Sequence, residues 1–573
     1  MTDLFGFLEG VSPAWPLILG GLLALAIPSA PFRKLVMIAA PLLAIAAWFA
    51  TREPGVYGLI DLGPMTLETY RYDALSRVWA LVFVLIAFIN GVYAFHERGR
   101  FSDAASLIYA GSAVGAVFAG DLLTLFFFWE LTAIASVPLI LAAGGPKARR
   151  AGLRYLAIQV LSGVLVLGGG TMWAVETGSW AFDRLNLGSA AGWALLIGFG
   201  IKACFPVLHM WMTDAYPKAT AFGAVVLSAF TTKMAIYALA RGFPGLDLLI
   251  YVGAAMAVYP IVFAIVENDL RRTLAYGLMN QLGFMVVAVG VGSELALNGA
   301  AANAFAGVIY MALMFMVTGA ILKRTGTAKA TELGGLFSAM PLTGMFAIVG
   351  ALAVVGAPLF SGFVAKTLIL SAVHYDHIGW LYALLIFASA GVAEQSALKV
   401  PYFAFFGRKR AWTVSEAPTG MLAGMGLCAF LCVYLGVNYE ALYGLLPFDF
   451  DYEPYKIDSV IGQIQILLSG LVAFGLLVWF RLYPLRDRTL LDLDWIYRYF
   501  GDGATRWGVA MSRLLVQFSQ SRAGAFAGAA RAKLFAVFSP AGTLSREFPA
   551  GLMALWTAIL LAGVVLVAYF SPL

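Results

Sequence analysis

Apolar runs of roughly 17–25 residues, each long enough to cross a lipid bilayer, recur along the whole chain. Of the 573 residues, 61% are hydrophobic and 12% are charged, whereas a soluble domain carries about 25% charged residues. That deficit excludes a soluble protein with a large core. The sequence therefore predicts an all-α polytopic membrane protein with about 16 transmembrane helices.

The expected helices follow from the positions of the apolar runs. They lie near residues 14–28, 35–50, 78–95, 104–119, 122–143, 154–174, 190–209, 221–240, 247–266, 272–292, 301–322, 338–372, 378–398, 419–439, 460–482 and 551–570.

Three segments depart from simple helices. Residues 55–72 alternate in polarity and contain Gly63-Pro64, which predicts a small hairpin. Residues 338–372 are too long for one crossing and contain Gly356, Pro358 and Gly362, so we expect two half-helices there. Pro206 similarly interrupts the end of 190–209.

The distribution of basic residues predicts the orientation in the membrane. Alternate connections carry clusters of Lys and Arg, and the connections between them are poor in bases and carry acids. By the positive-inside rule, both termini are expected on the non-cytoplasmic side of the cell inner (plasma) membrane. The basic connections contain Arg33-Lys34, Arg98 and Arg100, Lys147 to Arg150, Arg271-Arg272, Lys323 to Lys329 and Arg408 to Arg410.

Residues 484–550 mix arginines with aromatic and aliphatic side chains. This mixture predicts an amphipathic helix on the cytoplasmic membrane surface. The alternative is a plain linker to a final anchor at 551–573.

Several classes of function are excluded. The net charge of +6 comes from bases at the ends of apolar segments, which argues against nucleic-acid binding. Three cysteines inside apolar runs show neither metal-ligand spacing nor a disulfide framework. No glycine-rich dinucleotide loop, cluster-type cysteines or haem ligands are visible, so we expect no metal and no cofactor.

Five charged residues lie inside or at the end of apolar helices: Glu130, Lys202, Lys233, Lys366 and Lys399. An ionisable residue at mid-membrane costs roughly 2.5–3.5 kcal/mol on insertion scales and usually marks a functional site. Alternatively, the lysines reach towards the membrane surface, as the end position of Lys399 favours, and Glu130 forms a packing ion pair.

Such residues suit proton transfer. Burial disfavours the charged form of an amine, and a nearby carboxylate favours it again. Moving the carboxylate away therefore expels the proton. Glu130 and Lys202 are the expected switching pair.

The motifs around these residues resemble the proton-translocating antiporter-like subunits shared by respiratory complex I and the Mrp multisubunit cation/proton antiporters. The matching runs include Phe128-Trp-Glu-Leu, Lys202-Ala-Cys-Phe-Pro-Val-Leu-His-Met-Trp, Leu227-Ser-Ala-Phe-Thr-Thr-Lys-Met and Asp269-Leu-Arg-Arg-Thr-Leu-Ala-Tyr-Gly. Gly334-Gly-Leu-Phe, Gly356-Ala-Pro-Leu-Phe-Ser-Gly-Phe-Val-Ala-Lys and Leu398-Lys-Val-Pro-Tyr-Phe look closest to the Mrp D-type subunit.

The resemblance implies two inverted five-helix repeats, each with a broken helix, which would place the ion path at mid-membrane. Lys202 and Lys366 would correspond in the two repeats, as would Lys233 and Lys399. The implied regions are 1–103 (N-terminal helices), 104–240 and 247–410 (the two repeats), 411–483 (additional helices), 484–550 and 551–573.

One helix departs from the family pattern. Relatives typically place two histidines and often a lysine in the helix at 301–322, where this chain has Asn303, Gly307 and Met311. A path between Lys233 and Lys366 would then depend on water held by polar side chains, or be closed. The expected supporting residues are Thr232, Asn280, Gln281, Tyr310 and Thr318.

The leading hypothesis is an ion-transporter subunit of an Mrp-like antiporter, not an enzyme, acting with other membrane subunits on protons and Na⁺ or K⁺. One alternative is the membrane arm of another complex, such as complex I, a membrane-bound hydrogenase or an inorganic-carbon uptake system. The other is a non-conducting scaffold, which the replacements in 301–322 favour.

Overall fold

The structure is a computed structural model that describes residues 8–63, 65–97, 99–392, 398–407, 410, 412–480 and 550–570. It divides into two units, Met1–Leu490 and Leu491–Leu573. In the described residues, 11 helices are long and apolar enough to cross a membrane. This confirms the polytopic all-α architecture. The predicted surface helix at 484–550 lies outside the described residues apart from its last position.

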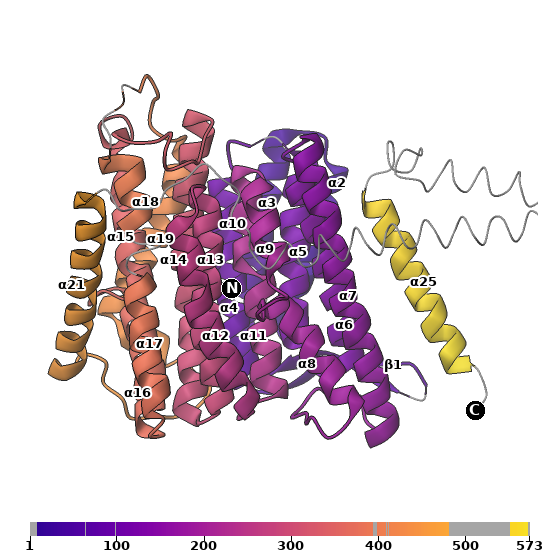
Figure 1. The fold of residues 1–573 in the computed structure, drawn as a ribbon. Coiled ribbons are helices and arrows are strands. Elements are labelled where there is room, and N and C mark those ends of the chain that lie inside the picture. Colours follow the sequence, from indigo (N-terminus) through magenta and orange to yellow (C-terminus); the bar gives the residue numbers. More distant parts are fainter. Residues whose placement is uncertain are drawn as a thin grey trace, which may run out of the picture. The chain divides into compact units, whose positions relative to one another are not determined.

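The long helices of the first unit overlap the apolar runs of the sequence (Figure 1). They are α2 (Ala14–Ala26), α3 (Ala30–Ala50), α4 (Ala74–Tyr93), α5 (Arg100–Phe118), α6 (Leu122–Leu141), α7 (Gly145–Thr177), α8 (Ala190–Ala203), α9 (Met210–Ala215), α10 (Ala221–Ala229), α11 (Thr231–Gly242), α12 (Asp247–Val266), α13 (Leu270–Val291), α14 (Glu294–Thr325), α15 (Pro341–Val355), α16 (Ser361–Tyr375), α17 (Gly379–Val392), α18 (Lys399–Pro401), α19 (Thr419–Val437), α20 (Tyr439–Tyr443) and α21 (Ile457–Trp479). The second unit contains α25 (Ala550–Phe570).

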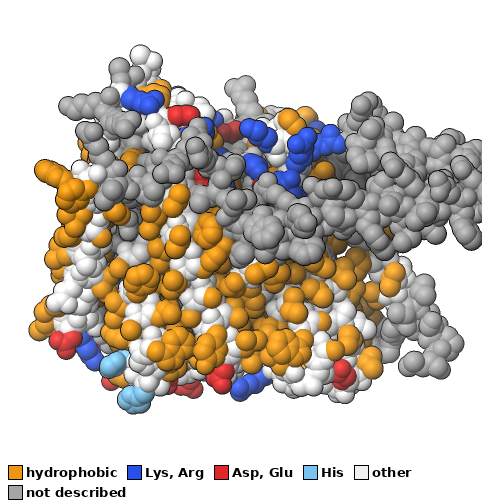
Figure 2. Space-filling model, viewed as in Figure 1, with side chains coloured by type: hydrophobic (Ala, Val, Ile, Leu, Met, Phe, Trp, Pro, Cys, Tyr) orange, Lys and Arg blue, Asp and Glu red, His pale blue; other side chains and the backbone are white. Residues whose placement is uncertain are grey.

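The outer surface carries the signature of a membrane protein. On the face shown in Figure 2, hydrophobic side chains cover the middle and charged side chains gather at the upper and lower edges. Large apolar residues such as Leu19, Phe127 and Val262 are more than half exposed. An exposed apolar surface of this kind is stable against lipid tails and not against water.

The predicted hairpin is present as β1 (Gly55–Asp61) paired with antiparallel β2 (Thr66–Tyr72). It is tied to the start of α6, because the backbone N–H of Glu68 donates to the Asp121 carboxylate at 2.8 Å. Asp73, just beyond β2, forms an ion pair with Arg241 of α11 at 2.6 Å. The hairpin therefore fastens the ends of two helices on one side of the bundle.

Two helices are broken, as the sequence predicts, and the breaks have the same backbone geometry. Cys204 and Val207 have positive φ between α8 and α9, and Gly356 and Leu359 do so between α15 and α16. The N–H of Phe205 donates to the Gly200 carbonyl, and the N–H of Ala357 donates to the Leu352 carbonyl. Each of these bonds spans five residues. Positive φ is strained for residues with a side chain, so the fold must hold both breaks in place.

A third break was not predicted. The helix expected at 221–240 is divided into α10 and α11 at Phe230, whose ψ is −67°. Neither glycine nor proline lies at this point. The division frees main-chain groups inside an otherwise apolar span, and each freed group needs another partner.

Further features recur in the two halves of the first unit. Asp121 caps α6, and Asp269 caps α13. Each also forms an isolated bridge to the chain after the following helix, Asp121 with Ala181 and Asp269 with Lys329. Two copies of one structural unit would show such matching contacts. The inverted relation of the repeats and their boundaries stay predictions.

Candidate functional site

The structure buries all four lysines that the sequence singles out. Lys202, Lys233, Lys366 and Lys399 are at most 1% exposed, whereas Glu130 is half-buried. All four ammonium groups donate hydrogen bonds to main-chain carbonyls. The buried charges are therefore held mainly by backbone dipoles.

Lys202 lies in the last turn of α8, where the helix dipole favours a cation. Its Nζ donates to the carbonyl of Trp129 at 2.5 Å and to Thr132 Oγ1 at 3.0 Å. The same atom lies 4.6 Å from the centre of the Trp129 ring. Lys202 thus contacts α6 one residue before Glu130 and two residues after it.

Glu130 does not form a direct ion pair with Lys202 within the described chain, although the two charges interact electrostatically. Glu130 Oε1 is buried and has no hydrogen-bond partner among the described residues. It packs against the α carbon of Gly163 on α7. The structure thus brings the predicted pair together with the lysine bonded elsewhere, and the switching itself stays a prediction.

Lys233 is held by the unpredicted break. Its Nζ donates to the carbonyl of Ser228, near the end of α10, at 2.6 Å. The N–H of Thr231, also freed by the break, donates to the Tyr109 hydroxyl at 3.1 Å. Thr232 Oγ1, expected to support a water path, is buried without a hydrogen-bond partner among the described residues.

Lys366 binds at the break between α15 and α16. Its Nζ donates to the carbonyl of Val354 at 2.9 Å and lies 5.6 Å from the centre of the Phe284 ring. Lys202 precedes its break, whereas Lys366 follows its own. The two lysines thus lie on opposite sides of their breaks along the chain, and their correspondence in the two repeats stays a prediction.

Lys399 has different surroundings. Its Nζ donates to three carbonyls at the C-terminal end of α12, those of Ala264 at 2.7 Å, Ile265 at 3.0 Å and Glu267. A cation at a helix C-terminus satisfies carbonyls that the helix itself cannot. Lys399 therefore caps α12.

Of the five polar residues predicted to support a path, Asn280, Gln281 and Tyr310 form a cluster, and Thr232 and Thr318 lie outside it. The Tyr310 hydroxyl donates to Gln281 Oε1 at 3.0 Å and to Asn303 Oδ1 at 3.1 Å. The Gln281 amide donates to Asn280 Oδ1 at 3.3 Å. Thr318 instead donates to carbonyls of its own helix. α13 and α14 thus share a buried polar cluster.

Gly307 and Met311 add no polar group to this cluster. Both lie on α14 among its buried residues, and Met311 is fully buried. A thioether is only a weak acceptor. Closure of the path near Met311 stays a prediction.

Sequence reasoning missed the hydroxyl groups near Lys202 and Lys233, including Thr132 and Tyr109. A serine, threonine or tyrosine within an apolar run has no sequence signal that separates it from a packing residue. Among the described residues, no group of three or more His, Cys, Asp or Glu could hold a metal ion.

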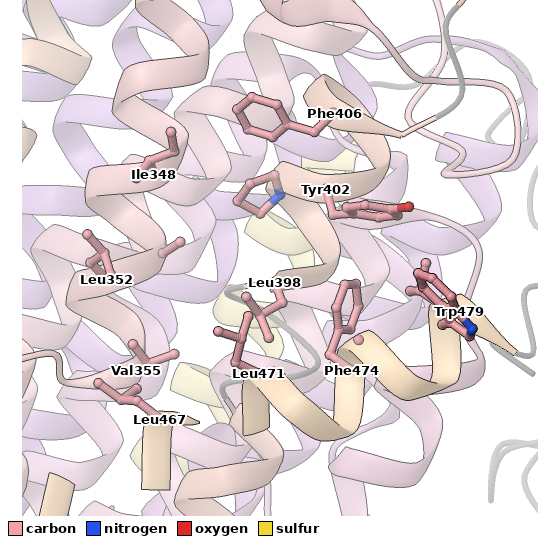
Figure 3. A pocket seen from close by; sticks show the side chains of 14 residues that line it. Ile348, Leu352, Val355, Leu398, Tyr402, Phe406, Leu467, Leu471, Phe474 and Trp479 are labelled. Atoms are coloured by element: carbon pink, nitrogen blue, oxygen red, sulfur yellow. The ribbon is translucent and has the colours of Figure 1, made fainter. Parts of the chain in front are cut away.

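An apolar groove of about 630 Å³ lies apart from these charges, between α15, residues 398–406 and α21 (Figure 3). Its labelled side chains include Leu352, Tyr402 and Phe474. The groove contains none of the predicted site residues.

A family model described as NADH:quinone oxidoreductase/Mrp antiporter, transmembrane, matches residues 119–391. This stretch contains Glu130, Lys202, Lys233 and Lys366, and it spans α6 to α17. Residues 119–391 are therefore similar to this family. The antiporter family resemblance inferred from the motifs is thereby confirmed.

Relatives in this family include a named antiporter component. The D-type subunit of the Na⁺/H⁺ antiporter of Bacillus subtilis is 26% identical over 64% of this chain and 80% of its own length. An uncharacterized protein of Mycobacterium tuberculosis is 32% identical, covering 56% of each chain. The chain thus spans little more than half the length of this relative. A chain of the Mrp complex from Dietzia shares the fold, with a TM-score of 0.69 and 20% identity over 83% of this chain and 100% of that chain.

Proposed function

We propose that this chain is the D-type antiporter-like subunit of an Mrp-like multisubunit cation/proton antiporter of the cell inner (plasma) membrane. It would move protons and act with other membrane subunits on Na⁺ or K⁺. The observation that carries the proposal is the set of lysine side chains buried in residues 119–391, two of which bind carbonyls at helix breaks.

The break geometry suits proton exchange. An ammonium group has three donors. In the described residues, Lys233 directs one of these donors to a single carbonyl. The remaining hydrogens are those that could leave, while the carbonyl keeps the amine in place.

The distance between Glu130 and Lys202 would control whether the Lys202 amine holds or releases a proton. With Lys202 bonded to Trp129 and Thr132, its charge is not directly paired. Movement of either side chain towards the other would favour the protonated amine, and separation would release the proton.

Reconstitution of the purified complex tests the proposal. In proteoliposomes, an imposed Na⁺ or K⁺ gradient is expected to drive proton movement in the opposite direction without a reductant. A requirement for a quinone or another reductant would instead indicate the membrane arm of a redox complex. Absence of proton movement under both conditions would support the non-conducting scaffold that the replacements on α14 favour.

Gly163 provides a test of the carboxylate's position. A methyl group at Gly163 would lie 2.5 Å from Glu130 Cδ and overlap Oε1. Gly163→Ala is therefore expected to displace Glu130 and lower proton transport by about tenfold, equivalent to about 1.4 kcal/mol.

Gly168→Ala on the same helix is the matched control, because no atom lies within 4 Å of its added methyl group. Transport rates of the two variants would be compared at equal amounts of assembled complex. Equal rates for Gly163→Ala and Gly168→Ala would show that the position of Glu130 against α7 is unimportant.

A further inference from the structure

Two tyrosine hydroxyls bind the main-chain groups that the break between α10 and α11 leaves free. In an unbroken helix, the N–H of Thr231 would donate to the Leu227 carbonyl, four residues earlier. Here the Tyr216 hydroxyl donates to the Leu227 carbonyl at 2.7 Å, and the Thr231 N–H donates to the Tyr109 hydroxyl at 3.1 Å. Each half of the missing helix bond is thus satisfied by a tyrosine from another element.

Tyr216 is fixed from several sides. It begins the short 3₁₀ helix η1 (Tyr216–Lys218) and is fully buried. Its ring lies 5.9 Å from the ring of Trp211 on α9 and 6.3 Å from that of Phe315 on α14. Its own carbonyl accepts a hydrogen bond from Arg271 of α13 at 3.0 Å. The hydroxyl therefore approaches the end of α10 from a position that three other helices set.

Tyr109 of α5 holds the other side of the break. It is fully buried, and its hydroxyl also lies 2.6 Å from Thr231 Oγ1. Its ring lies 5.1 Å from the ring of Phe230, the residue at which the helix divides. The ring of Phe83 on α4 lies 5.5 Å from the same Phe230 ring. The start of α11 is therefore held by contacts from α4 and α5.

The contact of Lys233 depends on this opening. The carbonyl after that of Leu227 belongs to Ser228, and it accepts from the Lys233 ammonium at 2.6 Å. In an unbroken helix, the Thr232 N–H would donate to this carbonyl instead. Closure of the break would therefore give the Ser228 carbonyl a partner that competes with Lys233. Because Tyr216 binds the Leu227 carbonyl, closure has to displace its hydroxyl first.

The break between α15 and α16 shows a similar arrangement. There the Val354 carbonyl accepts from Lys366, and the adjacent carbonyl, that of Val355, accepts from the Gln463 amide of α21 at 2.9 Å. Gln463 is buried, and it comes from an element far from η1 in the sequence. Two breaks that hold a lysine thus each have a second side-chain donor on the neighbouring carbonyl.

We propose that Tyr216 and Tyr109 are positioning residues for Lys233. By occupying the two groups that would close the helix, they hold the break open and keep the Ser228 carbonyl available to the ammonium. Neither hydroxyl has to exchange a proton with the lysine. This inference rests on the proposed proton transport.

A structure of the complex carrying Tyr216→Phe tests the positioning directly. Without the hydroxyl, the Leu227 carbonyl is expected to accept from the Thr231 N–H. The two helices should then become continuous, and Lys233 should leave the Ser228 carbonyl.

Tyr109→Phe removes the partner of the Thr231 N–H and is expected to close the break in the same way. It therefore carries the test if Tyr216→Phe does not assemble. An open break in either assembled variant, with Lys233 still bonded to the Ser228 carbonyl, would contradict the proposal.

Transport by the reconstituted complex gives a second readout. Tyr216→Phe is expected to slow proton transport by about tenfold. The pH of half-maximal transport should also shift, because Lys233 loses a carbonyl that favours its charged form. Tyr93→Phe is the matched control, since Tyr93 is equally buried and donates to the Met316 carbonyl within the continuous helix α14 at 3.0 Å. Its rate and pH profile should not change.

The outcomes separate positioning from packing and from the proposed function. A slower rate in Tyr216→Phe with an unchanged pH profile would show that the hydroxyl supports packing alone. Wild-type rates and profiles in both tyrosine variants would contradict the proposal if Lys233→Ala abolishes transport. If Lys233→Ala leaves transport unchanged, the proposed function fails, and the structures of the variants still report whether the tyrosines hold the break open.

Discussion

Proton transport by the assembled complex is expected to fall to background when Lys202 is replaced by alanine. The substitution removes a titratable amine that bonds to α6 on both sides of Glu130. Glu130 would then lose the positive charge that interacts with it. Proton uptake into proteoliposomes containing the purified complex measures this effect.

Lys218→Ala provides the control for loss of a lysine nearby. Lys218 forms an ion pair with Asp214 and is about one third exposed, so its removal should leave transport nearly unchanged. Transport that persists in Lys202→Ala, with the complex intact, would show that the α6 and α8 contact has no part in proton movement.

The second large effect is expected on stability. Lys399→Ala removes the ammonium that serves three carbonyls at the end of α12. Leaving a buried acceptor unsatisfied costs about 1–3 kcal/mol, so we expect a total loss of at least about 3 kcal/mol. Thermal unfolding of the purified complex should show a clearly lower midpoint.

Lys456→Ala is the control, because Lys456 lies exposed at the start of α21. An unchanged unfolding midpoint in Lys399→Ala, accompanied by loss of transport, would contradict the capping role. It would instead support the proton-transfer role that the sequence suggested for Lys399.

Much of the architecture could be predicted because it depends on local sequence. Apolar length defines the helices, and proline and glycine mark two of the three breaks. The break at Phe230 carries no such signal. It is stabilised by distant partners, with Tyr109 accepting from one freed group and Lys233 donating to another. Tertiary contacts of this kind cannot be read from one sequence.

The candidate site was predictable only in part for a similar reason. A charged residue in an apolar run is conspicuous, so Lys233 and Lys366 could be chosen directly. Their partners are main-chain carbonyls, which every residue possesses. The role of Gly163 beside Glu130 likewise depends on how α6 and α7 pack.

The central claim is that protons use the half containing Glu130, Lys202 and Lys233. The polar cluster around Tyr310 contains no acidic or basic side chain, and Met311 on the same helix is fully buried. A proton path needs groups that exchange protons, or an unbroken file of water. We therefore expect the route towards Lys366 to be closed near Met311 at rest.

The most direct measurement compares proton transport by reconstituted complexes carrying Lys233→Ala or Lys366→Ala. We predict that Lys233→Ala abolishes transport and that Lys366→Ala leaves most of it, because protons leave the first half by a local exit or a neighbouring subunit. Equal loss in both variants, with ordered water spanning Met311, would show a continuous path and contradict this account.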